Sequence, residues 1–205
     1  MNPGMDPGVD DSGITEALVG TLAADGTTHL APLGFRRQRE HVVLAPFHPS
    51  RTLDNLRERG VASISHVCDA RVFAGCLTGR RDWPMAACEQ VACARLADAV
   101  THQELRVLRI DETDPQRPRF VCDELLMRAH RPWSGYNRAQ AAVLEGCILV
   151  SRLQLLPMAR IRAEMAQLGI AVDKTAGPRE REAWQWLLQR VAQFDALQAR
   201  VESGA

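Results

Sequence analysis

The sequence predicts an α+β protein in which an antiparallel β-barrel-like domain is followed by C-terminal helices. Three observations support this class. The turn pair Asp25-Gly26 joins two apolar runs, which is a strong hairpin signal. Strand-like runs continue to about residue 133, and after about residue 134 the apolar residues follow a helical period. Strands first and helices later are typical of α+β proteins rather than of doubly wound sheets.

This pattern predicts a division of the chain into three parts. Residues 1–13 contain prolines, glycines and acids and read as a disordered leader. Residues 14–133 form the predicted barrel domain, and residues 134–205 form a helical region that we expect to pack on the barrel.

The predicted strands and helices follow from apolar runs and their punctuation. The first hairpin pairs Ile14–Leu22 with Thr28–Phe35. Further strands are predicted at His41–Phe47, Val61–Val67, Leu105–Ile110 and Phe120–Met127. A short helix opens near Pro49, with Ser50 or Thr52 as its N-cap, and ends at Gly60. Later helices are predicted at Asn137–Val150, between Pro157 and Gly169, and from Pro178 onward.

Composition and charge disfavour several classes of function. Lys plus Arg and Asp plus Glu are 25 each, so no global positive charge favours nucleic-acid binding. No apolar run is long enough to cross a bilayer, and the N-terminus lacks a signal-peptide pattern, so we expect a cytoplasmic protein. The six cysteines show no C-x-x-C pair and no zinc-module spacing, which favours reduced core thiols and no metal. No G-x-G-x-x-G follows a strand, so a Rossmann fold has no support.

Ser50, Arg51, Thr52 and Asn55 form a candidate phosphate site. They lie at the predicted start of a helix, where free backbone N–H groups and the positive end of the helix dipole favour anions. An Arg side chain adds bidentate pairing to phosphate oxygens. The alternative is an ordinary capped helix with a solvated Arg.

Pro32 and Gly34 mark the return strand of the hairpin as unusual. Proline cannot donate a hydrogen bond to the sheet, and glycine lets a backbone or a flat ring approach closely. One interpretation is a planar ligand against this strand, and the other is an edge strand with a bulge. Asn137 and Arg138, at the start of a later helix, form a third candidate in which Arg138 reaches an anion; here the alternative is helix capping.

Together, several stretches resemble the DUF447 family, which is similar to the flavin-reductase-like FMN-binding split barrels. They are ITEALVGTLAADGTTHLAPLGF, LAPFHPSRTLDNL, SHVCDARVFAG, YNRAQAAVLEGCILVSR and KTAGPREREAW. The resemblance covers the chain from about Ile14 to the last helix, apart from Arg80–Val91. It implies a six-stranded Greek-key split barrel that forms a homodimer, with FMN in a groove near the dimer interface.

The resemblance also assigns residues to the FMN site. The isoalloxazine ring would lie along His29, Ala31, Pro32, Leu33 and Gly34, and the phosphate and ribityl end would contact Ser50, Arg51, Thr52 and Asn55. Asn137 and Arg138 match the family's helix-start motif and would close the site. His66 stands where the family leads us to expect Asn, which would alter hydrogen bonding if this position touches flavin.

From this resemblance we expect a flavin-dependent oxidoreductase of unknown substrate, linked to methanopterin-dependent one-carbon metabolism. His29 and His66 are then the candidates for proton delivery. Two alternatives stay open. One is a non-enzymatic flavin carrier or sensor, or a scaffold that has lost its cofactor. The other is an oxidase on the same fold that resembles pyridoxal-phosphate oxidases.

Overall fold

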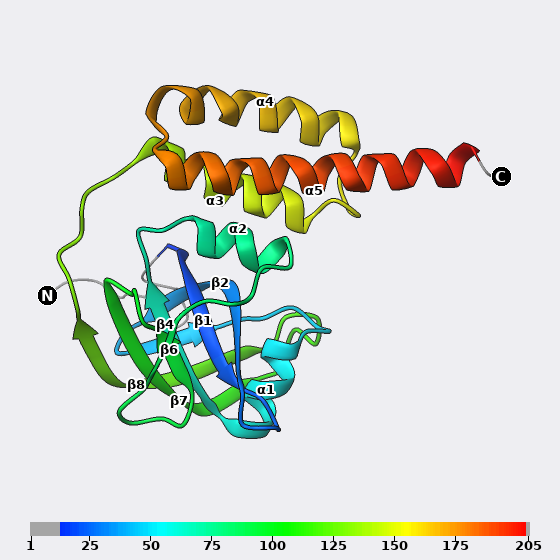
Figure 1. Ribbon diagram of the computed structural model, residues 1–205. Helices are drawn as coiled ribbons and strands as arrows, with labels where there is room; N and C mark the ends of the chain where they lie inside the picture. Colours follow the sequence, from blue (N-terminus) through cyan, green and yellow to red (C-terminus); the bar gives the residue numbers. More distant parts are fainter. Residues whose placement is uncertain (1–12, 204–205) are drawn as a thin grey trace, which may run out of the picture. The chain divides into compact units, whose positions relative to one another are not determined.

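The computed structural model describes residues 13–203, which form two compact units (Figure 1). The first unit consists of residues 13–67 and Pro84–Pro132, and the second of Cys68–Trp83 and residues 133–203. The leader predicted at residues 1–13 lies outside the described residues, except for Gly13. The segment Cys68–Trp83 belongs to the second unit, although it lies inside the range that the sequence analysis assigns to the barrel.

Six strands of the first unit close into an antiparallel barrel among the described residues, in the order β1-β2-β3-β8-β7-β4. They are β1 (Thr15–Leu22), β2 (Thr28–Gln38), β3 (His41–Leu44), β4 (Val61–His66), β7 (Thr101–Asp111) and β8 (Arg119–Ala129). This arrangement confirms the predicted fold class, an α+β protein with a six-stranded Greek-key split barrel. Side chains alternate along each strand, so Phe35, Leu44 and Phe120 fill the interior while their neighbours face outward.

Helix α1 (Arg51–Arg59) closes one end of the barrel. Ser50 is its N-cap, with Oγ accepting from the Leu53 N–H at 3.3 Å, and Gly60 ends it in the left-handed region at a φ of 63°. Leu53 and Leu56 are 0% and 1% exposed and belong to the core of the barrel. The predicted boundaries of this helix are therefore confirmed, with Ser50 rather than Thr52 as the cap.

The pairing of β2 with β3 ends earlier than the sequence predicts. The two strands pair from Gln38↔His41 to Phe35↔Leu44, so the predicted strand His41–Phe47 stops at Leu44. Continuing the register would place Pro46 opposite Leu33. The last paired residue of β3 thus lies two residues before a proline, a residue that is found at strand ends and on open edges rather than within central strands.

A small hairpin that the sequence analysis did not predict covers part of the barrel's outer surface. It is formed by β5 (Met85–Ala87) and β6 (Ala94–Leu96), and β6 lies beside β4 (Figure 1). Ser63 Oγ donates to the Ala94 carbonyl at 2.7 Å, and Ser65 Oγ accepts from the Leu96 N–H at 3.1 Å. These bonds explain why both serines are fully buried although they point away from the barrel interior.

The described part of the second unit contains four helices. They are α2 (Arg71–Leu77), α3 (Arg138–Ser151), α4 (Met158–Thr175) and α5 (Pro178–Ser203). No sequence pattern predicted α2. The predicted end of α4 near Gly169 is wrong, because a single glycine inside a long helix is tolerated. At Gly146 a Cβ atom would lie 2.9 Å from the Trp184 ring, so this glycine allows α3 and α5 to approach closely. None of the described helices is long and apolar enough to span a membrane.

Gly20 allows β6 to lie tightly against β1, and its replacement tests this packing. A Cβ atom there would lie 2.6 Å from Ser63 Oγ and 2.8 Å from the Ala94 carbonyl oxygen. We expect Gly20→Ala to lower the free energy of unfolding by about 1–3 kcal/mol, as overpacked sites do. Chemical denaturation measures the change. Gly13→Ala is the control, since nothing lies within 4 Å of its Cβ position, and equal stability of the two variants would contradict the packing.

Candidate functional site

The edge of β2 between Thr28 and Gly34 is open on one side. Along this stretch β2 pairs with β1, and no other described strand pairs with it, since β3 reaches only to Phe35. Every second residue of such an edge turns its N–H and C=O away from the paired strand. Pro32 pairs opposite Leu18 without a register shift, so the β1–β2 pairing contains no bulge. The open edge therefore offers backbone groups to a ligand, except at the proline nitrogen.

The predicted residues on β2 fall on two faces. His29, Ala31 and Leu33 share the face of the interior residue Phe35, whereas Pro32 and Gly34 share the outer face with Arg36. All five predicted residues are half-buried. At Gly34 a Cβ atom would meet Ile14 Cγ2 at 2.4 Å, so the Ile14 side chain occupies the space over this glycine on the outer face.

The predicted phosphate residues on α1 have different surroundings. Arg51 is exposed and Ser50 is half-buried at the start of the helix. Thr52 and Asn55 are 4% and 5% exposed, and Asn55 Nδ2 donates to Thr21 Oγ1 at 2.9 Å. In this structure Asn55 therefore fixes α1 to β1, while Ser50 and Arg51 are the members of the set that a ligand can reach.

The structure links α1 to the beginning of the open edge. Thr21, which accepts from Asn55, pairs directly opposite His29. Arg59 donates to the Ala24 carbonyl at 2.7 Å, in the turn between β1 and β2. The predicted ring-binding residues on β2 and the predicted phosphate-binding residues on α1 are thus connected through Thr21 of the hairpin.

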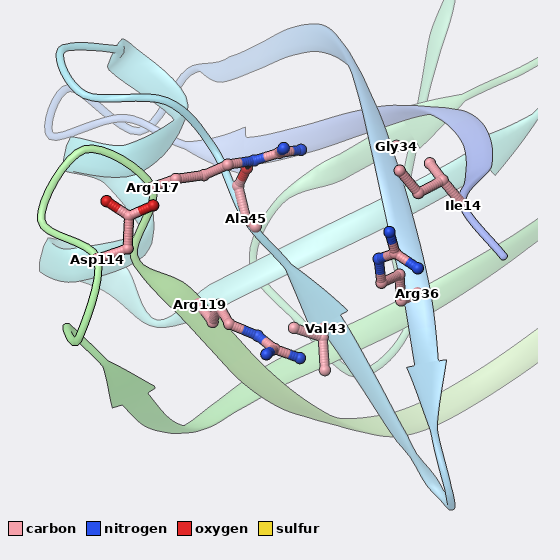
Figure 2. A pocket seen from close by; sticks show the side chains of 8 residues that line it. All are labelled: Ile14, Gly34, Arg36, Val43, Ala45, Asp114, Arg117 and Arg119. Carbon is pink, nitrogen blue, oxygen red and sulfur yellow. Dashed lines mark hydrogen bonds between the residues drawn. The ribbon is translucent and has the colours of Figure 1, made fainter. Parts of the chain in front are cut away.

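A pocket rich in arginine lies on the outer face of the barrel beside Gly34. Its volume is about 220 Å³, and it is lined by Ile14, Gly34, Arg36, Val43, Ala45, Asp114, Arg117 and Arg119. Figure 2 shows Arg36 on the same strand as Gly34, and Arg117 and Arg119 projecting toward it from the other side of the pocket. Three guanidinium groups and one carboxylate give this pocket an excess of positive charge, which favours an anionic ligand.

The far wall of this pocket is held by contacts between two loops. Arg117 Nε donates to the Ala45 carbonyl at 3.0 Å, and its guanidinium stacks over the Phe47 ring at 4.6 Å. The His48 N–H donates to the Gln116 carbonyl at 2.9 Å. The chain from β3 to α1 is therefore fixed against the loop between β7 and β8, not against β2.

His66 lies at the end of β4, in a polar part of the barrel interior. Its ring packs edge-on against Phe35 with centroids 5.8 Å apart, and its Nε2 is 3.4 Å from Gln103 Nε2. Nearby, Arg37 forms an ion pair with Glu124. Burial, together with the positive charge of Arg37, lowers the pKa of His66 below its usual value of 6.5.

Asn137 and Arg138 belong to the second unit. Asn137 is the N-cap of α3, with Oδ1 accepting from the Ala139 N–H at 2.8 Å, and Arg138 is exposed. The capping role that the sequence analysis kept as an alternative is therefore present. Their predicted contribution to the FMN site stays a prediction.

Sequence reasoning missed the arginines of the pocket. The outward direction of Arg36 could have been predicted, because it follows the buried Phe35 within a strand. Arg117 and Arg119 lie in and after a turn, and no local pattern shows that this turn returns to the end of β3.

The comparisons with known proteins place this split barrel and its helices in one family. The model of the N-terminal domain of proteins of unknown function (DUF447) matches residues 15–131, and that of the DUF447 C-terminal domain matches residues 137–189. These models cover more than half of the chain, so the chain belongs to the DUF447 family. No curated protein matches it.

Solved structures give the same fold. An FMN-bound DUF447 protein from Methanosarcina mazei matches with a TM-score of 0.76 and 18% identity, covering 88% of this chain and 96% of that one. Two weaker matches have TM-scores of 0.49. A 2-nitrobenzoate 2-nitroreductase from Pseudomonas fluorescens is 21% identical, covering 59% of this chain and 68% of that one. A flavoredoxin from Methanosarcina acetivorans is 16% identical, covering 63% and 76%.

The lowered pKa of His66 predicts a pH dependence of stability. The unfolded chain takes up a proton at this residue more readily than the folded chain, so stability is lost as the pH falls below 6.5. We expect the wild type to lose more free energy of unfolding than His66→Asn between about pH 7.5 and about pH 5. Urea denaturation at both pH values measures this, with His48→Asn as an exposed control. An equal loss in wild type and His66→Asn would contradict the buried setting.

Proposed function

We propose that this protein binds FMN and acts as a flavin-dependent oxidoreductase on a small substrate. The observation that carries the proposal is the open edge of β2, which offers a flat ligand backbone groups beside a glycine. Membership of the family and the match over most of the chain to an FMN-bound family protein supply the identity of the ligand.

The residues of the open edge fit the ring of FMN. A flavin ring carries N–H and C=O groups on one side and is otherwise flat, and an unpaired strand edge offers both donors and acceptors. In the proposal the backbone near Leu33 and Gly34 bonds the polar side of the ring. The missing N–H of Pro32 disfavours the pairing of another strand at this place.

The start of α1 fits the phosphate of FMN. The backbone N–H groups of its first turn point out of the helix, and Arg51 is exposed beside them. Asn55 and Thr52 act indirectly in this proposal, because they are buried and hold α1 in position. Thr21 connects the two ends of the site, since it contacts Asn55 and pairs opposite His29.

When bound, FMN would supply the hydride or electron transfer, and this chain would supply position and electrostatics. His29 is half-buried on the inner face of β2 and remains the candidate for moving a proton near the ring. Burial lowers the pKa of His66, so its ring is held neutral near pH 7. A homodimer and a link to methanopterin-dependent one-carbon metabolism stay predictions.

The phosphate assignment is tested by binding of FMN to variants of α1. We expect Arg51→Ala to weaken FMN binding about tenfold, because a charge-assisted contact is lost. Fluorescence quenching of FMN on titration measures the affinity. Arg57→Ala is the control, since Arg57 lies in the last turn of the same helix and pairs with Glu112 at 2.6 Å.

The arginine pocket provides the competing location for the phosphate. Arg36→Ala and Arg119→Ala are therefore titrated alongside. Loss of affinity in these variants, with Arg51→Ala unchanged, would move the phosphate to the pocket and overturn the assignment to α1. A wild-type protein that neither quenches FMN fluorescence nor gains thermal stability with FMN would overturn the proposal as a whole.

Catalysis is tested separately from binding. We expect the FMN-loaded protein to oxidise NADH or NADPH faster than the same amount of free FMN, because a site on an open edge leaves one side of the ring accessible. The loss of nicotinamide absorbance measures the rate. Tight binding of FMN without such turnover, with either nucleotide, would contradict the oxidoreductase and favour the flavin carrier.

A further inference from the structure

Three side chains that could bind a metal, Cys88, His102 and Glu104, meet on the outer face of the barrel, where the loop of the β5–β6 hairpin lies over β7, and Cys93 is beside them. Cys88 and Cys93 flank the loop of the hairpin, and His102 and Glu104 lie two residues apart on β7. Continuing the β5–β6 register places Cys88 directly opposite Cys93, and the Cys88 N–H donates to the Cys93 carbonyl at 3.4 Å. His102, Glu104 and Cys93 are 1%, 0% and 3% exposed, and Cys88 is half-buried. The proposed flavin site uses none of these residues.

The ligand atoms of this group are already close together. One atom each from Cys88, His102 and Glu104 lies within 4.8 Å of the other two. His102 Nε2 is 2.9 Å from Glu104 Oε1. A tetrahedral zinc site holds its ligand atoms roughly 3–4 Å apart, so these three residues need only a small inward movement. The Cys93 thiol lies outside this group and has to turn toward it. His102 and Glu104 lie on the same face of one strand, which fixes their relation to each other.

The backbone holds the Glu104 carboxylate in place before any ion binds. Its Oε1 accepts from the Glu89 N–H at 2.8 Å, and its Oε2 accepts from the N–H groups of Gln90 at 2.6 Å and Val91 at 3.2 Å. These three bonds also fix the hairpin loop over β7. One lone pair of Oε1 faces His102, at the place where a shared proton or a cation can lie.

We propose that Cys88, Cys93, His102 and Glu104 form a zinc site. Two thiolates and an imidazole favour Zn²⁺ over the hard cations Mg²⁺ and Ca²⁺, and a carboxylate completes a tetrahedral set. Zinc replaces the proton between His102 Nε2 and Glu104 Oε1. The imidazole proton then resides on Nδ1, which lies 2.8 Å from His130 Nε2 and donates to it. Such an outer hydrogen bond is typical of histidines that bind zinc.

The sequence did not reveal this site because its spacing is that of no zinc module. The ligands come from two elements, a hairpin and a barrel strand, and the hairpin lies against the barrel through Ser63 and Ser65. In the proposal, zinc joins the loop end of a hairpin of two three-residue strands to β7. Its function is therefore structural, since all four ligand positions are filled by the protein.

The experiment measures zinc and cobalt binding by the full-length protein, reduced and freed of metal with a chelator. We expect zinc to return to about one ion per chain, and cobalt(II) to give the thiolate charge-transfer absorption and the strong visible bands of a tetrahedral site. Cys88→Ser should abolish the charge-transfer contribution of that thiolate and weaken zinc binding at least about tenfold. Cys68→Ser is the matched control, because Cys68 is a free cysteine of the second unit.

Several results would overturn the proposal. They are a wild-type protein that binds no zinc, a cobalt spectrum without thiolate absorption, and equal zinc affinity of wild type and Cys88→Ser. A Cys88–Cys93 disulfide in protein purified without oxidant would also contradict it. Cys93→Ser, examined in the same way, replaces Cys88→Ser if that variant does not fold. The wild-type cobalt spectrum tests the site without any variant, and none of these readouts requires FMN.

Discussion

The early end of the β2–β3 pairing is the constraint on which the first unit depends. The two strands stop pairing at Phe35↔Leu44, and the chain leaves the barrel wall after Leu44. It is then held by the β7–β8 loop through Arg117 and Gln116, and it reaches α1 at Ser50. The same departure leaves the edge of β2 open and produces one wall of the arginine pocket. The point where one strand pairing ends therefore connects the topology of the barrel with the position of the candidate site.

Helix α1 combines a structural and a functional position. Its inner face, with Leu53, Leu56 and Asn55, closes the barrel and contacts β1. Its first turn remains at the surface, with Arg51 exposed. Because the inner face is fixed by core packing, the backbone N–H groups at the start of the helix have a fixed direction. This is the physical basis for a preorganised anion site at a helix start.

Sequence patterns predicted the parts of the fold that local chemistry determines. The Asp25-Gly26 turn, the Ser50 and Gly60 caps and the helices near residues 138–150 and 178 onward are confirmed. Local sequence patterns did not predict the features that depend on contacts between distant parts of the chain. The strands β5 and β6 are three residues long and are held by serines of another strand. Thr52 and Asn55 are predicted ligand contacts, and their burial depends on how α1 meets the barrel, which the sequence pattern does not show. The arginine pocket joins residues far apart in the chain, which no local period reveals.

The place of α2 has a consequence for how the chain can be divided. Because Cys68–Trp83 belongs to the second unit, the polypeptide passes from one unit to the other at three points, and neither unit is a continuous segment. Val72, Phe73 and Cys76 of α2 are buried in a unit that also contains α3 and α5, with which α2 is in contact. A fragment ending near residue 132 would carry α2 without these helices and expose its apolar face. The gene therefore encodes two modules that cannot be separated by a single cut.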